Sequence, residues 1–393
     1  MSYKNFLKEA RALEKEFTEI RRYLHAHAEL GFSLPYTVGF VFAKLREYGY
    51  APEKCGRAGI TATVGKGGKT FLLRADMDAL HMREETGLPF SSHGGNMHAC
   101  GHDMHTAMLL LAAKILRAHE SELCGTVKLM FQPAEETLSG AKDMIEAGVL
   151  ENPHADAAFM LHVLSGVSAP AGAVIVPRGG VSAPSADYFD IIVKGKACHG
   201  ASPEAGANAL LCAAHIITAL SSLSAREIGI NERALFTIGK MTAGSAPNAI
   251  AGEALLSGTV RAYGAHSQEK LKRRISEISR TVGSAFRTEA EVRFGKGTPA
   301  LNNDAALSAR IGKYCRELLP HEYVLPADIL GGAGGSEDFA YIAEKVPSAM
   351  VSLSAGTREY PLHHPKVCFD ESVIPTGGAL YAYTAARFLS ENA

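Results

Sequence analysis

Hydrophobic residues in the first part of the chain follow two alternating patterns. Apolar positions recur at helical spacing in residues 3–30, 36–48, 106–119 and 140–147. Between these segments lie short apolar runs, bounded by glycine or polar residues, that are typical of strands. They occupy residues 59–65, 70–78, 127–136 and 156–163. The alternation of strand and helix predicts an α/β domain with a largely buried sheet.

The pattern changes near residue 185. Strands at 187–197, 234–244, 252–263 and 290–296 and helices at 207–223 and 266–287 follow one another in the order βαββαβ, the ferredoxin-like arrangement. After Gly297 the first pattern resumes, with helices at 304–319, 336–345 and 376–389 and a strand at 348–356. We therefore predict an α/β domain split between residues 1–184 and 296–393, with a ferredoxin-like domain inserted at residues 185–295.

Composition and charge narrow the range of partners. The 393 residues are 47% hydrophobic and 21% charged, with a net charge of −1, which gives no reason to expect nucleic acid or an acidic membrane surface as a partner. The N-terminal segment has no apolar signal region, and we find no uninterrupted apolar run of membrane-spanning length, so we expect a cytoplasmic protein. Seven scattered cysteines argue against a disulfide framework.

Polar side chains stand at the ends of three predicted strands. Asp76 and Asp78 end one strand, Glu135 and Glu136 end the next, and His162 lies at the end of the third. Ligand sites in open α/β sheets form at the carboxyl ends of strands, so we expect these side chains to converge. For His162 alone, a hydrogen-bonded structural residue would be the more common interpretation.

The segment HACGHDMH, residues 98–105, adds a thiol and imidazoles. Cys100 and His102 are two residues apart, and in extended backbone such side chains point the same way. A thiolate can bridge two metal ions, and coordination would deprotonate it. Taken alone, the pair is a weak signal, because a polar loop in which Asp103 caps the following helix would look similar.

Glu135 and Glu136 are adjacent, and neighbouring residues on a strand point to opposite sides. One carboxylate can then bind metal while the other takes and returns a proton of metal-bound water. The competing interpretation is a solvated acidic turn, and the preceding apolar strand argues against it. His363 and His364 lie in a PLHHP segment, and the residue types leave open which of them is a ligand.

The five potential ligands are more than one closed, four-coordinate zinc site can use. They fit two metal ions that share a bridging ligand and leave a position for water, an arrangement suited to hydrolysis. A thiolate ligand favours Zn²⁺, and carboxylate ligands also bind Mn²⁺. Ni²⁺ or Co²⁺ could take the place of either ion.

The motifs resemble those of the M20 metallopeptidase family, specifically its amidohydrolase branch, over nearly the whole chain. That branch includes hippurate hydrolases, N-acyl-amino-acid amidohydrolases, N-acetylcysteine deacetylases and plant auxin-conjugate hydrolases. One departure is Ala28, where the family usually has a structural proline. The matching segments are 21–32, 74–80, 98–105, 132–136, 161–163, 199–203, 334–341 and 362–365.

The resemblance implies a role for individual residues. Cys100 would be the bridging ligand, where the peptidase branches have an aspartate, and Glu135 would be the general base. Asp78 would orient a ligand. The L-H-x-P pattern favours His363 over His364. The metal ligands implied are Cys100, His102, Glu136, His162 and His363.

The inserted domain would act as a lid and as the interface of a homodimer or tetramer. His199 would reach a neighbouring active site and polarise the scissile carbonyl. The resemblance also implies that Asn248 and Arg261 bind substrate. The fork of N–H donors on an arginine suits a carboxylate. A surface residue with an ordinary salt bridge is the competing interpretation of Arg261.

Together these features predict metal-dependent hydrolysis of a small-molecule N-acyl amino acid, such as an N-acetyl or N-benzoyl derivative. The products would be a carboxylic acid and a free amino acid. One alternative is a dipeptidase or aminopeptidase of the same fold, which a cysteine at position 100 argues against. A non-enzymatic metal-binding protein is the other, and it would have no need of a second carboxylate beside Glu136.

Overall fold

The computed structural model describes residues 5–330, 335–356 and 359–393. Contacts divide the chain into two compact units. Unit 1 comprises Met1–Gly180, Asn302–Ala333 and Asp338–Ala393, and unit 2 comprises Val181–Leu301 and Gly334–Glu337. The insertion predicted at 185–295 lies within the longer segment of unit 2.

Unit 1 is built on an eight-stranded sheet with the order β1-β2-β4-β3-β5-β16-β6-β15. At its centre β4, β3, β5 and β16 run parallel to one another. The central strands are buried along nearly their whole length, which explains their near-continuous hydrophobic runs. The strands are β1 (Glu53–Cys55), β2 (Gly59–Gly65), β3 (Lys69–Asp76), β4 (Gly125–Gln132), β5 (Ala157–Leu164), β6 (Val174–Val176), β15 (Val324–Pro326) and β16 (Ser348–Ser354).

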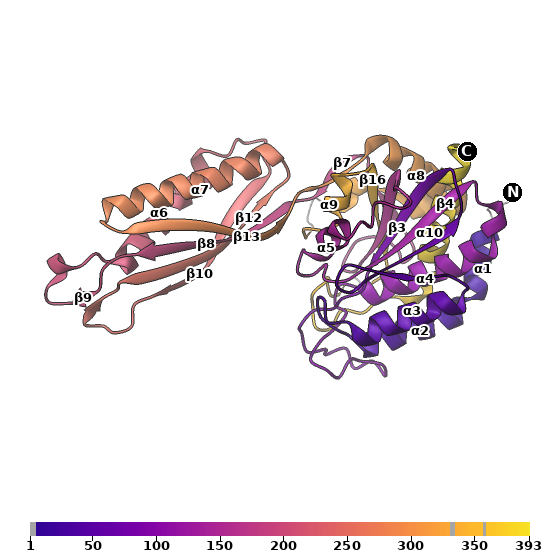
Figure 1. Cartoon of the computed structure of the whole chain (residues 1–393), viewed down its shortest axis with the longest axis horizontal. Coiled ribbons are helices and arrows are strands. Elements are labelled where there is room, and N and C mark those ends of the chain that lie inside the picture. Colours follow the sequence, from indigo (N-terminus) through magenta and orange to yellow (C-terminus); the bar gives the residue numbers. More distant parts are fainter. Residues whose placement is uncertain (1–4, 331–334, 357–358) are drawn as a thin grey trace. The chain divides into compact units, whose positions relative to one another are not determined.

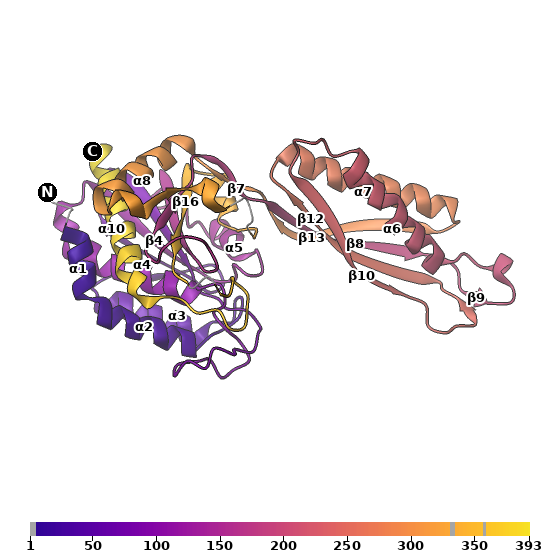
Figure 2. The same cartoon turned by 180° about the vertical axis from the view of Figure 1, so that it is seen from behind.

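Helices cover this sheet. Helix α4 (His102–Ala118) has 14 buried residues among its 17, so it is a core helix that is apolar almost all round. It packs against α10 and β3, and Figure 2 shows α4 and α10 in front of the sheet. The remaining helices are α1 (Phe6–Ala12), α2 (Glu14–Ala26), α3 (Pro35–Glu47), α5 (Gly140–Glu146), α8 (Ala305–Leu318), α9 (Ala340–Ala343) and α10 (Ile374–Glu391).

Unit 2 confirms the ferredoxin-like prediction. Its antiparallel sheet has the order β10-β12-β8-β13, and both helices lie on one face of that sheet (Figure 1). Phe189, Ile191 and Val193 of β8 point into a core with apolar residues of the helices. The elements are β8 (Ser185–Lys194), α6 (Ala209–Arg226), β10 (Ala234–Ala243), β12 (Glu253–Ala262), α7 (Ala265–Ala285) and β13 (Glu289–Thr298), with a small pair of β9 (Cys198–His199) and β11 (Ala249–Ile250).

Helix α6 has the length and mean hydropathy of a membrane-spanning helix. Its buried residues recur at helical spacing, from Ala209 through Cys212 and Ile216 to Leu220 and Leu223. They belong to the apolar core of unit 2. A single apolar helix with one face buried in this way is typical of a globular core.

The structure corrects two helix predictions. The helical pattern within residues 3–30 is divided at Leu13 into α1 and α2. Residues 336–345 contain only the four-residue helix α9. The Asp338 carboxylate accepts hydrogen bonds from Gln132 Nε2 at 2.7 Å and from the Ala141 N–H at 2.9 Å. These bonds hold the start of that segment in a non-helical path.

Candidate metal centre

The predicted polar clusters meet at one edge of the sheet of unit 1. Strands β4, β3 and β5 are parallel neighbours, so their carboxyl ends lie together. Asp78 follows β3, the two glutamates follow β4, and His162 lies near the end of β5. Cys100 and His102 reach the same edge at the start of α4, and His363 reaches it from the loop after β16.

Two groups of potential ligand atoms share the Cys100 thiol. One group contains Cys100, His102 and His162, and the other contains Cys100, Glu136 and His363, with the atoms of each group within 4.8 Å of one another. Cys100 Sγ lies 3.6 Å from His162 Nε2 and 3.3 Å from His363 Nε2. We call these five residues the Cys100 cluster. Two three-residue sites with one thiol in common suit two divalent ions bridged by a thiolate.

Two buried atoms of the Cys100 cluster lack a hydrogen-bond partner among the described residues. They are His102 Nε2 and Glu136 Oε1, which lie 3.9 Å apart. His102 Nδ1 donates to the Asp78 carbonyl at 2.8 Å, which leaves an unprotonated Nε2 on the neutral ring. Buried polar atoms are normally satisfied, so two lone-pair donors facing each other fit a cation between them.

Burial disfavours the charged forms of Cys100, Glu136 and His162, and a cation would reverse this effect for the thiol and the carboxyl group. Burial raises the pKa of Glu136 to about 7, with Asp78 and Asp76 adding to it and His102 opposing it. Burial also raises the pKa of the Cys100 thiol well above its ordinary value. Burial lowers the pKa of His162 to about 3, which keeps the ring neutral as a metal ligand requires. A bound dication would favour the thiolate and the carboxylate.

Asp78 organises the centre through its backbone and its side chain. Its Oδ1 accepts from the Glu135 N–H at 3.0 Å and its Oδ2 from the Glu136 N–H at 3.2 Å. Its carbonyl accepts the His102 bond described above. One fully buried residue therefore orients three side chains that face the centre.

The local geometry differs from the extended backbone that the spacing predicts. Gly101 has φ +81° and lies directly before α4, so Cys100 and His102 meet across a left-handed residue. Glu135 and Glu136 lie in a turn beyond β4, after Ala134 with φ +56°. Their carboxylates do not point to opposite sides, because both lie within 3.9 Å of His102 Nε2.

The structure distinguishes the two adjacent histidines. The His363 N–H donates to the Ala99 carbonyl at 3.0 Å, and the residue has φ +64°. This left-handed conformation is uncommon outside glycine and recurs at functional sites. His364 instead stacks on Tyr360, with ring centroids 4.5 Å apart, and its Nδ1 accepts from the Lys366 N–H. His363 is the one that joins the Cys100 cluster.

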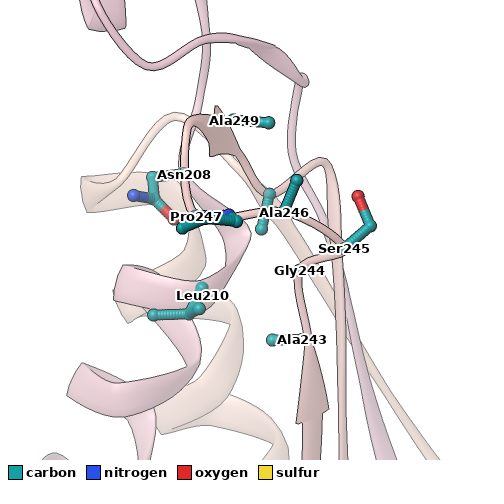
Figure 3. A pocket seen from close by; sticks show the side chains of 9 residues that line it. Asn208, Leu210, Ala243, Gly244, Ser245, Ala246, Pro247 and Ala249 are labelled. Atoms are coloured by element: carbon teal, nitrogen blue, oxygen red, sulfur yellow. The ribbon is translucent and has the colours of Figure 1, made fainter.

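The other predicted site residues lie in unit 2. His199 of β9 pairs with Ala249 of β11, and the Gly200 N–H donates to the Asn248 carbonyl, so His199 and Asn248 lie side by side. The loop before Asn248 lines a pocket of about 330 Å³, and Asn208 and Leu210 form its other side (Figure 3). Arg261 lies apart from this pair, on β12, with its guanidinium 5.6 Å from the Tyr188 ring.

The sequence prediction missed two buried residues beside the Cys100 cluster. His105 and Arg74 are both fully buried, and both contact Asp76. The available signal was their place in motifs already noted, since His105 follows His102 by one helical turn and Arg74 begins the segment 74–80.

Comparison with known proteins supplies a family context. Residues 72–387 match the model of peptidase family M20/M25/M40. An N-acetyl-L-cysteine deacetylase of Bacillus subtilis is 33% identical, over 97% of this chain and 90% of the relative. A hippurate hydrolase of Campylobacter jejuni is also 33% identical, over 98% of this chain and 100% of the relative. A solved structure of a dinuclear metal binding peptidase from Bacillus subtilis matches with a TM-score of 0.81 and 29% identity, over 98% of this chain and 100% of that one.

Proposed function

Because this chain belongs to peptidase family M20/M25/M40 and is a hydrolase of amide bonds, we propose that it hydrolyses the amide of an N-acylated amino acid. The names of the relatives support this substrate class, since one is an N-acetyl-L-cysteine deacetylase and another a hippurate hydrolase. A cysteine stands at the shared position of the Cys100 cluster, which supports the same choice over a dipeptidase.

The observation that carries the proposal is the pair of unsatisfied buried atoms in the Cys100 cluster. His102 Nε2 and Glu136 Oε1 face each other without a hydrogen-bond partner in the described part of the chain. Cys100, His102 and His162 would hold one divalent ion, and Cys100, Glu136 and His363 the other. Zinc or manganese suits this mixture of thiol, imidazole and carboxylate, and nickel or cobalt are the next candidates.

Glu135 is the proposed general base. When bound, the metal ions supply Lewis acidity toward the acyl carbonyl and lower the pKa of water. The Glu135 carboxylate is nearly buried, and its Oε2 lies 3.8 Å from His102 Nε2. It would take a proton from the attacking water and return it to the leaving amine. Asp78 fixes the Glu135 backbone and so limits where that carboxylate can reach.

His199 is the proposed donor to the oxyanion, acting from the partner subunit of a homodimer. The Ala201 N–H donates to His199 Nδ1 at 3.0 Å, so the neutral ring carries its proton on Nε2. That proton is a hydrogen-bond donor on an exposed side chain. A donor of this kind would stabilise the negative charge that develops on the acyl oxygen.

Asn248 and Arg261 are the proposed substrate-binding residues of unit 2. Arg261 Nη1 is buried and has no hydrogen-bond partner among the residues that the structure describes. A guanidinium with an unused N–H suits the carboxylate of an N-acyl amino acid. Asn248 lies next to His199, so both would approach the same end of a substrate.

A substrate screen tests the proposal. Enzyme stripped of metal is reconstituted with Zn²⁺, Mn²⁺, Ni²⁺ or Co²⁺ and given N-acetyl and N-benzoyl amino acids beside dipeptides of the same amino acids. We expect kcat/KM for at least one N-acyl amino acid to exceed that for its matched dipeptide. Faster cleavage of the dipeptides with every metal would replace the proposal with a dipeptidase, and no amide hydrolysis with any metal would overturn it.

A further inference from the structure

A layer of buried hydrogen bonds lies behind the Cys100 cluster in unit 1. Asp76 closes β3, and His105 lies in the first turn of α4. His105 Nδ1 and Asp76 Oδ1 are 2.6 Å apart, and both side chains are fully buried. On its other side, the His105 ring contacts the backbone of β5, next to the proposed ligand His162.

The hydrogen bonds of His105 define its tautomer. The Val163 N–H lies 2.8 Å from His105 Nε2. A backbone N–H can only donate, so Nε2 accepts and carries no proton. The proton is therefore on Nδ1, which donates to Asp76. Both ring nitrogens are engaged, and neither is available to coordinate a metal.

Asp76 is likewise engaged through both carboxylate oxygens. Oδ1 accepts from His105, and Oδ2 accepts from Arg74 Nη1 at 2.7 Å. Arg74 in turn donates to Gln132 and to Asp338, both at 2.9 Å, in a fully buried network. Asp76 Oδ2 is also 3.7 Å from His102 Nε2, close enough to add negative charge behind that histidine.

The Val163 backbone links His105 to the proposed ligand His162. The N–H that His105 accepts belongs to the peptide unit directly after His162. The Val163 carbonyl accepts from His162 Nδ1 at 2.7 Å, which leaves His162 Nε2 directed at Cys100 Sγ. The His105 and His162 rings also meet at 64°, with centroids 4.7 Å apart. The tautomer of His162 is therefore set by Val163, and its ring is packed against His105.

We propose that Asp76 and His105 are positioning residues that set the occupancy of one metal position, the one formed by Cys100, His102 and His162. In the described part of the chain, Cys100, Glu136 and His363, which form the other position, make no hydrogen bond to His105. The Asp76–His105 pair therefore supports only one of the two ions. When this pair is broken, the ion held by Cys100, His102 and His162 is lost before the other. This inference rests on the two-metal centre of the proposed function.

The experiment compares metal binding, not turnover alone. His105→Phe keeps a ring of similar size and removes both hydrogen bonds. Metal content per subunit is measured by atomic emission during titration with a competing chelator. We expect the wild type to bind two ions per subunit. His105→Phe should bind one ion with unchanged affinity and the other with an affinity lowered on the order of 10- to 100-fold.

Two further variants separate positioning from general destabilisation. In His105→Gln, the amide oxygen can accept from the Val163 N–H while the amide N–H donates to Asp76, so we expect partial recovery of the lost ion. Tyr50→Phe is the matched control, because it removes a buried hydrogen bond from Tyr50 to the Ala113 carbonyl elsewhere along α4. It should lower thermal stability without changing the number of bound ions.

The outcomes distinguish this inference from the proposed function. A wild-type protein that binds no pair of ions contradicts the proposed two-metal centre itself. Two ions of unchanged affinity in His105→Phe, or equal weakening of both, overturn the inference and leave that centre intact. If His105→Phe does not fold, the test is the protonation of the two nitrogens of the His105 ring in the wild type. It is measured by nitrogen-15 NMR, with the signals of the ring assigned by their absence in His105→Gln. A proton on His105 Nε2 overturns the inference, and a proton on Nδ1 supports it.

Discussion

Asp78 Oδ1 accepts a hydrogen bond from the backbone N–H of Glu135 at 3.0 Å, so the residue beyond β3 fixes the turn that carries the proposed general base. The same carboxylate holds the Glu136 N–H through its other oxygen. Two adjacent glutamates with different proposed tasks therefore share one anchor, and their relative placement depends on it.

Asp78→Asn should weaken both metal binding by Glu136 and proton transfer by Glu135. An asparagine has one amide oxygen, so its NH₂ group would face one of the two backbone N–H groups. We expect a loss in metal affinity or kcat on the order of 10- to 100-fold, measured by chelator titration and by initial rates. Asp156→Asn is the control, because Asp156 accepts from the Thr70 N–H at the opposite end of β3. Equal effects in the two variants would contradict a specific role for Asp78.

Glu135→Gln should abolish turnover and leave the metal in place. The amide keeps the shape of the side chain but cannot accept a proton, so kcat should fall by about 10²- to 10⁴-fold. Metal content per subunit should stay near that of the wild type, because Glu135 is outside the proposed ligand set. Activity comparable with the wild type would remove Glu135 from the mechanism.

His199→Ala tests the donor from the partner subunit. Its loss should lower kcat by about 10²- to 10³-fold, since the oxyanion loses one hydrogen bond. If His199 serves the neighbouring active site, subunits of His199→Ala and Glu135→Gln that are mixed and allowed to exchange should regain activity. Each hybrid dimer then contains one site with an intact Glu135 and an intact His199. Mixtures no more active than either parent would argue that His199 does not act between subunits.

Metal removal should leave a folded but inactive protein. The Cys100 cluster lies at the edge of a core that extends over the whole sheet and α4, so packing alone should maintain the fold. After chelation we expect a cooperative thermal transition at a lower Tm, because a ligand that binds the native state stabilises it. Activity should return with Zn²⁺ or Mn²⁺. Loss of cooperative unfolding without metal would favour a structural site over a catalytic one.

Glu84 should make stability sensitive to acid. Burial opposes its ionisation, but hydrogen bonds from His25 and Thr86 lower the pKa of Glu84 to about 2, against 4.5 ordinarily. A carboxyl with a lowered folded pKa stabilises the protein above its unfolded pKa, and this contribution disappears as pH falls toward the folded value. The Tm difference between wild type and Glu84→Gln, both without metal, should therefore be largest above pH 4.5 and shrink toward pH 2. A constant difference would exclude this linkage.

The gathering of polar residues at one sheet edge could be predicted from sequence because β3, β4 and β5 are buried parallel strands. Such strands appear as apolar runs, and the polar residues that follow mark where each run ends. The insertion could be predicted for a similar reason, since its helical and strand periods are distinct. The convergence expected of Asp78, Glu135, Glu136 and His162 therefore follows from hydrophobic patterning.

The local geometry of the centre could not be predicted in this way. A Cβ on Gly101 would come within 2.3 Å of Val163 Cγ2, so the turn before α4 is set by a strand far away in the sequence. Alternation along strands does not apply in the turn that holds Glu135. The role of His105 depends on the Val163 N–H, a backbone group that has no signature in the sequence. These features arise from contacts between segments that are distant in the sequence, so local residue patterns do not predict them.

Cys100 and His363 are 263 residues apart in the sequence, and the whole of the long segment of unit 2 lies between them. An ion bound by both would act as a reversible cross-link that closes a very long loop. In an unfolded chain, closing such a loop removes more conformational entropy than closing a short one. The metal that the enzyme uses would then also bind the first and last segments of unit 1 to each other. Metal supply would therefore govern how long the folded enzyme survives as well as whether it works.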